Sequence, residues 1–288
     1  MRDQAESLRK KLFHAQMNQS AKSIAIVSGK GGVGKTNFSV NYALSLVQQG
    51  KKVLLFDLDI GMGNVHLILG AQAEKTIADY ITENCSLSDI IQHSHGLDYI
   101  SGGNGLPELM NLDSDLLQRF LRHMESLQTT YDYLIFDMGA GAQSFYLQFL
   151  LSVQHIFVVT TPEPTAITDA YSMMKYITLL DQNQNFYLVC NRVEDDTEGR
   201  EVLQRLKTAV KKFLQKDVHI LGMIPEDKTI KKAVLAQQPV VLAYPKSKVA
   251  KAIQTIPFSF EQGRPMVVES VNFIQRLRTY LLDRRGTF

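Results

Sequence analysis

Gly29-Lys30-Gly31-Gly32-Val33-Gly34-Lys35-Thr36 determines how this 288-residue sequence folds and what it binds. The stretch satisfies G-x-x-x-x-G-K-[ST], in which glycines let backbone N–H groups curl around phosphate groups. An apolar strand over 24–28 precedes it, and a helix is predicted over 35–49. A helix beginning here directs its positive end at an anion. The segment therefore predicts a phosphate-binding loop.

The two residues that close the loop favour a nucleoside triphosphate with Mg²⁺. Lys35 is expected to reach the outer phosphates, and the Thr36 hydroxyl is expected to bind the metal. Gly29, Gly31 and Gly34 also match the dinucleotide pattern G-x-G-x-x-G, and Asp57 follows Gly34 by 23 residues. A dinucleotide site is the rival hypothesis. It is disfavoured because a Lys-Thr pair would crowd a pyrophosphate held by backbone alone.

Acidic residues close two further apolar strands. Asp57 and Asp59 end LLFDLDIG, and Asp137 ends YLIFD before MGAG. Ligands of α/β folds bind at the carboxyl ends of the strands, so these acids are expected near the phosphates. Asp137 fits the pattern that holds Mg²⁺, and a carboxylate that orients water is sufficient for phosphate hydrolysis.

Continuous apolar runs alternate with helix-length segments along the chain. Continuous runs are typical of strands buried on both faces, and this alternation predicts an α/β fold with a mostly parallel sheet covered by helices on both faces. No repeat or linker divides residues 23–260, so one domain is expected. The predicted strands are 24–28, 53–58, 97–101, 133–137, 155–161, 186–190 and 218–224. The predicted helices are 35–49, 114–128, 142–151, 165–181, 198–215 and 228–237.

Composition excludes several other classes of protein. The chain is 45% hydrophobic and 21% charged, which argues against disorder. Its two cysteines, Cys85 and Cys190, lie far apart in sequence and suit neither a disulfide framework nor a cysteine metal site. The N-terminus lacks an apolar leader, and no run of 18 apolar residues offers a membrane span. A cytoplasmic protein is expected.

Charge is unevenly distributed along the chain, although the net charge is only +2. Residues 1–22 and 264–288 each carry five basic and two acidic residues, which leaves the middle of the chain acidic. We therefore predict three parts: an N-terminal segment over 1–22, a nucleotide-binding domain over 23–262, and a C-terminal amphipathic helix within 263–288. The two basic ends either have separate functions or are ordinary solvated termini.

With Lys30 between the first two glycines, KGGVGKT resembles the deviant Walker A loop of the MinD/ParA ATPases, and the likeness spans about 23–262. The chain is most similar to the FlhG group (YlxH, FleN), which controls flagellar number and placement. Features of that group are Asn37 after the loop, DLDIGMGNVH at 57–66, TTPEPTAITDAY at 160–171 and an N-terminal DQAxxLR-like segment.

The resemblance implies a role for each matching residue. Lys30 resembles the signature lysine that reaches the phosphates of a partner subunit in an ATP-bound homodimer. Asp59 resembles the residue that orients the attacking water, while Asp57 and Asp137 hold Mg²⁺ largely through water. The implied nucleotide-binding set is Gly29, Lys30, Gly31, Gly32, Val33, Gly34, Lys35, Thr36 and Asn37, with Asn191, Pro225 and Glu226 around the base.

Two other branches of the family are disfavoured. The cysteines do not follow the switch strands, where an iron–sulfur cluster would need them. The acidic middle of the chain argues against DNA binding of the ParA kind, so no specific nucleic acid is expected.

The resemblance also gives the N-terminal segment a partner. It implies that this segment stimulates the GTPase FlhF, with Gln4 positioning a catalytic water. The matching residues are Asp3, Gln4, Ala5, Leu8 and Arg9. The alternatives are a frayed terminus and a helix that orders only on a partner.

Apolar residues recur at helical spacing near the C-terminus. Such a stripe either docks on the core or lies in a lipid headgroup layer, as a C-terminal helix does in MinD-like proteins. Both hold if ATP favours the released state. The membrane candidates are Val267, Val271, Phe273, Ile274, Leu277 and Leu281.

These features predict a slow, Mg-dependent ATPase that dimerises with ATP and regulates flagellar biogenesis. Its expected partners are a second copy, FlhF, flagellar C-ring components and the inner face of the cell membrane. The alternative is a cell-division or chromosome-positioning ATPase. A dehydrogenase and a nucleotide-free scaffold are the more distant rivals.

Overall fold

The computed structural model describes residues 20–59, 64–72, 74–83, 85–102, 114–139, 144–263 and 273–282. Several predicted functional residues lie outside these ranges: Asp3, Gln4, Ala5, Leu8, Arg9, Val267 and Val271.

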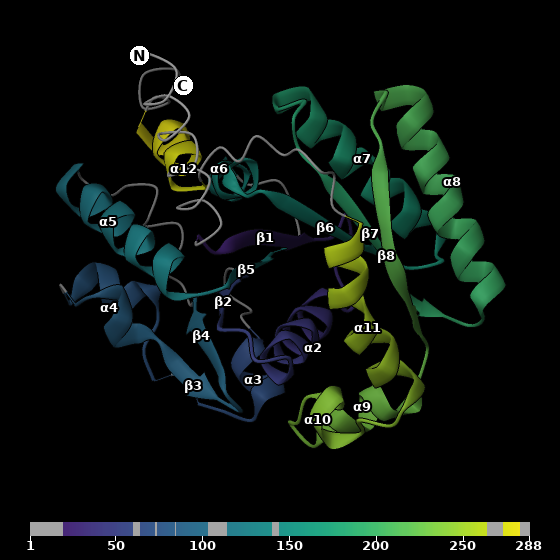
Figure 1. Cartoon of the computed structure of the whole chain (residues 1–288), viewed down its shortest axis with the longest axis horizontal. Coiled ribbons are helices and arrows are strands. Elements are labelled where there is room, and N and C mark those ends of the chain that lie inside the picture. The colour runs from purple at the N-terminus through teal and green to yellow at the C-terminus, as the bar shows by residue number, and fades with distance from the viewer. Residues whose placement is uncertain are drawn as a thin grey trace, which may run out of the picture.

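One eight-stranded sheet organises the described residues, in the order β3-β4-β2-β5-β1-β6-β7-β8 (Figure 1). All neighbouring pairs are parallel except β3 with β4 at one edge. The predicted fold class is therefore confirmed. The strands are β1 (Lys22–Val27), β2 (Val53–Leu58), β3 (Gln92–Ser94), β4 (Leu97–Ser101), β5 (Tyr133–Met138), β6 (His155–Thr160), β7 (Phe186–Val193) and β8 (Val218–Pro225).

Helices cover both faces of the sheet because successive strand residues point to opposite sides. On β5, Leu134, Phe136 and Met138 enter one apolar core, whereas Tyr133 and Ile135 enter the other. The first core packs α4 (Ile77–Thr82), α5 (Ser114–Thr130), α6 (Ser144–Ser152), α7 (Pro164–Leu180), α8 (Asp196–Leu214) and α12 (Phe273–Leu282). The second packs α2 (Lys35–Gln48), α3 (Val65–Leu69), α9 (Lys228–Leu235), α10 (Val240–Ala243) and α11 (Lys248–Gln262).

Every predicted strand is present, with bounds that differ by at most three residues. The predicted helices are also present, but the sequence analysis missed α3, α4, α10, α11 and the edge strand β3. Of these, α3, α4 and α10 have six residues or fewer, too short for a helical period to show. The longer α11 carries Pro257 inside it, and an interior proline is a helix-breaking signal.

The C-terminal helix α12 is docked on the core. Phe273 and Leu277 are fully buried, Ile274 and Leu281 nearly so, and α12 packs against α5 and α6. Arg276 pairs with Asp181 at the end of α7. The four candidate membrane residues on α12 therefore face protein in this structure and would have to leave it to reach lipid. None of the described helices is long and apolar enough to cross a bilayer.

Because Leu277 is completely buried, Leu277→Ala should leave a cavity in the core. We expect unfolding to become easier by about 2–5 kcal/mol, measured by urea denaturation of the full chain. Gln275→Ala, on the exposed side of the same helix, is the matched control and should change stability by less than about 0.5 kcal/mol. Equal stability of the two variants would show that α12 is not part of the core in solution.

Candidate functional site

The glycine loop bridges β1 and α2 at the carboxyl edge of the sheet. Gly32 and Gly34 have φ of +80° and +89°, a left-handed conformation that side chains disfavour. Gly29 is required for a different reason: a Cβ there would lie 2.2 Å from the carbonyl carbon of Asp169 in α7. At Gly31 a Cβ would meet nothing within 4 Å. The loop therefore packs closely on α7 at Gly29 and is open at Gly31.

A buried ion pair joins the loop to the sheet. The Lys35 ammonium lies 2.9 Å from the Asp137 carboxylate, and both side chains are buried. The Ser39 hydroxyl, one turn further along α2, lies 2.8 Å from the same oxygen. Lys35 thus contacts the strand that carries the predicted metal ligand Asp137.

Asp57 and Asp137 occupy matching positions on the neighbouring parallel strands β2 and β5, so both carboxylates face α2. Asp57 is fully buried and accepts hydrogen bonds from the backbone N–H groups of Asp59 and Val65. Burial, with the nearby negative charge of Asp137, raises the pKa of Asp57 to about 7. Two carboxylates share this pocket with one ammonium, an arrangement that a divalent cation would relieve.

The acidic pocket fits Mg²⁺ on its own geometry. The second carboxylate oxygen of Asp137 is buried and accepts no hydrogen bond from the residues that the structure describes. Such an orphaned acceptor is costly unless a cation or water satisfies it. Carboxylate and hydroxyl oxygens are the ligands that Mg²⁺ prefers, and Asp57, Asp137 and Thr36 would supply them. Asp59 is half-buried, and burial raises its pKa.

Lys30 reaches out of the loop toward α7. Its ammonium lies 2.9 Å from a Glu163 carboxylate oxygen and 3.2 Å from the Thr165 hydroxyl. This hydrogen bond and charge hold the pKa of Glu163 below its ordinary value. The pair is solvent-exposed, so it is weak and easily exchanged.

Asn191, at the end of β7, lies against the loop. Its side-chain amide donates to the Val33 carbonyl at 2.7 Å, and its side-chain oxygen accepts from the Arg192 backbone at 3.0 Å. Pro225 ends the neighbouring strand β8, and the Glu226 N–H donates to the Val193 carbonyl at 2.9 Å. The predicted base-binding residues are therefore brought together beside the loop. Their contact with a base stays a prediction.

Sequence reasoning missed three residues of the site: Ser39, Glu163 and Thr165. Ser39 could have been found, because it lies four residues after Lys35 and so on the same side of the helix. Glu163 and Thr165 belong to the fingerprint TTPEPT, to which no role was given. Asn37, included in the predicted nucleotide-binding set, is partly exposed, and its backbone carbonyl accepts a hydrogen bond from the Asn41 side chain. The Asn41 side-chain oxygen accepts from the backbone N–H of Val241 and so connects α2 to α10.

A phosphate-cradling loop, a buried lysine and two strand-end carboxylates define a P-loop nucleotide-binding site. Consistent with this site, the family model described as ParA, NUBPL iron-transfer P-loop NTPase, matches residues 19–260. The chain belongs to the ParA/MinD family of P-loop NTPases.

Two bacterial relatives are homologues of FlhG. The antiactivator FleN of Pseudomonas aeruginosa is 32% identical over 81% of this chain and 84% of its own length. The flagellum site-determining protein YlxH of Helicobacter pylori is 36% identical over 75% of this chain and 73% of its own. The septum site-determining protein MinD of Pyrococcus horikoshii, solved with Mg-ADP, has a TM-score of 0.66 and 27% identity. That alignment covers 85% of this chain and 96% of MinD. The MinD structure supports the use of nucleotide and Mg²⁺ by this family.

Gly29→Ala should destabilise the nucleotide-free protein, because the new methyl group overlaps the backbone of α7. We expect a loss of at least about 2 kcal/mol in unfolding free energy. Gly31→Ala, two residues away and facing open space, should unfold within about 0.5 kcal/mol of the wild type. Thermal unfolding without nucleotide measures both, and equal losses would mean that the loop does not pack on α7 as described.

Asp57→Asn should stabilise the metal-free protein increasingly as the pH rises. The pKa of Asp57 is raised from 3.8 to about 7, so its protonated form stabilises the fold. That contribution is complete at low pH and is lost as the pH rises through about 7. Relative to wild type, the variant should gain about 1.4 kcal/mol per pH unit between pH 5 and 7.

Urea denaturation at pH 5, 6, 7 and 8 in EDTA measures this gain. The exposed Asp115→Asn is the control, and its difference from wild type should not vary with pH in this way. A pH-independent difference for Asp57→Asn would show that Asp57 titrates normally in the folded chain.

Proposed function

We propose that the chain is a slow, Mg-dependent ATPase that dimerises with ATP and regulates the number and placement of bacterial flagella. The observation that carries the switch is Lys30, which leaves the phosphate loop and is held by exposed contacts with Glu163 and Thr165. A lysine inside a phosphate loop that does not face its own site is available for a partner's phosphates. The flagellar role is supported by the likeness to FleN and YlxH.

Each charged residue then has a separate task in hydrolysis. Bound Mg²⁺ would neutralise negative charge on the phosphates, and its ligands would be Thr36, Asp57 and Asp137. Lys35 exchanges Asp137 for the outer phosphates. Asp59 orients the attacking water, and its carboxylate accepts no hydrogen bond from any residue in the described ranges.

Dimerisation completes the site in this proposal. Lys30 exchanges Glu163 for the phosphates of the second subunit and neutralises charge that develops during transfer, as an arginine finger does. Since the Lys30–Glu163 pair is exposed, the exchange costs little. Hydrolysis removes the γ-phosphate and returns Lys30 to Glu163, which resets the switch.

The proposed partners use the two ends of the chain. Residues 1–22, with Gln4, would stimulate an FlhF-type GTPase, and the dimer would engage C-ring components of the flagellar basal body. The C-terminal region would bind the inner face of the cell membrane reversibly. Membrane binding requires α12 to undock, because its apolar residues are now buried in the core.

ATP with Mg²⁺ should convert the monomer to a dimer, and Asp59→Ala should trap that dimer by slowing hydrolysis. Size-exclusion chromatography with light scattering, with ADP and with ATP-Mg²⁺, measures the mass. Lys30→Ala should remain monomeric with ATP bound and should hydrolyse ATP at least tenfold more slowly. If wild type and Asp59→Ala both stay monomeric while ATP is demonstrably bound, the trans-lysine mechanism fails.

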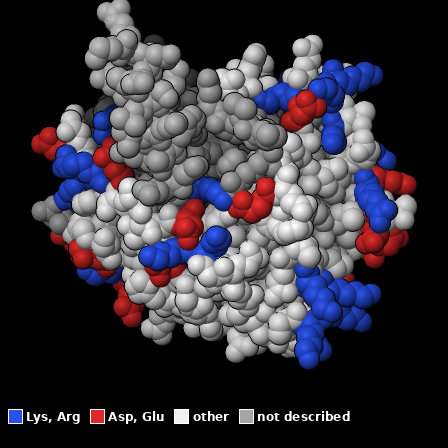
Figure 2. Space-filling model, in the orientation of Figure 1, with Lys and Arg blue, Asp and Glu red and all other residues white. Residues whose placement is uncertain are grey.

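A second candidate function, chromosome positioning, is favoured by one observation. Residues 228–251 contain six lysines and no acidic residue. Figure 2 shows Lys and Arg side chains gathered at the lower right, where α9 and α10 lie. The acidic average of the middle of the chain therefore conceals a basic surface. Retention of DNA at physiological salt, lost in Lys231→Glu, would favour this candidate over flagellar regulation.

A further inference from the structure

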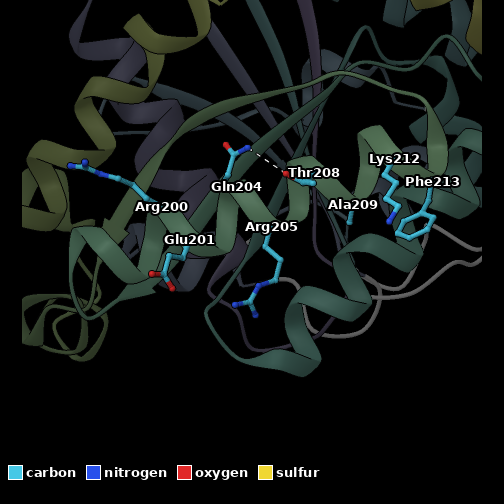
Figure 3. Close-up of a pocket in the computed structure, with 8 residues that line it drawn as sticks. All are labelled: Arg200, Glu201, Gln204, Arg205, Thr208, Ala209, Lys212 and Phe213. Carbon is cyan, nitrogen blue, oxygen red and sulfur yellow. Dashed lines mark hydrogen bonds between the residues drawn. The ribbon is translucent and has the colours of Figure 1, made fainter.

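The outer side of α8 carries a hollow of about 650 Å³ that lies outside the nucleotide site. Its lining residues follow two rows of four at i, i+4 spacing, and the third residue of each row is short: Thr208 in one and Ala209 in the other. The long side chain of Arg205 lies one turn before Ala209, and that of Phe213 lies one turn after it. Figure 3 shows the short side chain of Ala209 between the longer ones of Arg205 and Phe213.

The hollow combines an apolar end with positive charge. Phe213 is 64% exposed, and the ammonium of Lys212 lies 5.2 Å from the centre of its ring. Neither Arg205 nor Lys212 forms an ion pair with a described residue. The one acidic residue along the hollow is Glu201. An exposed aromatic ring beside unneutralised cations is typical of a binding surface rather than of a solvated helix face.

The hollow suits a chain segment better than a small molecule. All its lining residues come from α8, so it is open along the length of the helix, and they span about 20 Å from Arg200 to Phe213. The adjacent helix α7 extends the apolar area, because the rings of Tyr171 and Phe213 pack nearly perpendicular to each other with their centres 6.5 Å apart. A short helix or extended peptide fits these dimensions.

We propose that this surface of α8, from Arg200 to Phe213, binds an acidic amphipathic segment of a partner protein. An apolar side chain of the partner would rest on Thr208 and Ala209 against Phe213. Carboxylates on either side of it would pair with Arg205 and Lys212. Charge complementarity selects this partner, because the basic ends of this chain would be repelled by the same cations. The proposal does not depend on ATP hydrolysis.

Selection from a phage-displayed library of random 16-residue peptides on the full-length protein tests the proposal. We expect the enriched peptides to be acidic with apolar residues at helical spacing. Fluorescence anisotropy of the best peptides then gives their Kd values. Phe213→Ala and Arg205→Glu should each raise the Kd at least tenfold, while ATP hydrolysis stays at the wild-type rate.

Two matched variants separate binding at this surface from non-specific binding to any exposed aromatic ring or positive charge. Phe258→Ala removes an equally exposed ring on α11, and Lys51→Glu reverses a distant exposed charge; both should keep the Kd within twofold of wild type. The proposal is overturned by no enrichment, by enriched peptides that are basic or neutral, or by binding that survives Phe213→Ala. Self-association that Phe213→Ala abolishes would also overturn it, by assigning the surface to a second copy.

Discussion

The buried pair of Lys35 and Asp137 is the interaction on which the site depends. Burying one charge alone costs several kcal/mol, so each of these groups must always have a partner. In the structure they partner each other across α2 and β5. When a bound phosphate draws Lys35 away, Asp137 needs another cation. Asp57 lies beside it, and burial together with the charge of Asp137 already raises the pKa of Asp57. Nucleotide and metal are therefore expected to bind as a coupled pair, each removing the cost that the other creates.

Much of the site was predictable because its chemistry is local in sequence. The glycines that form the turns of the loop and Lys35 lie within eight consecutive residues, so the loop is recognisable as a motif. The strands are recognisable because burial on both faces makes them continuously apolar. Contacts between distant residues were not predictable. Nothing near Lys30 in sequence indicates that Glu163, 133 residues later, will hold it. For α12 the apolar stripe was evident from the sequence. A stripe indicates only that those side chains are removed from water, and either the protein core or a lipid layer can do this.

The surface of α8 and the nucleotide loop are connected through the starts of two helices. The loop touches α7 at Gly29 and Lys30, and it touches the end of β7 at Asn191, just before α8 begins. The loop therefore contacts α7, which carries Tyr171, and the strand that leads into α8, which carries Phe213.

The docking of α12 has a practical consequence for experiments on the tail. The ring of Phe273 packs 5.4 Å from that of Phe136, the neighbour of Asp137 on β5. Cutting off the C-terminal segment would thus strip one side of the strand that carries Asp137, a proposed metal ligand. A shortened protein that loses ATPase activity would be reporting a damaged interior, whatever the tail does at a membrane. Exposed positions such as Gln275, changed one at a time, leave that strand covered and separate the two effects.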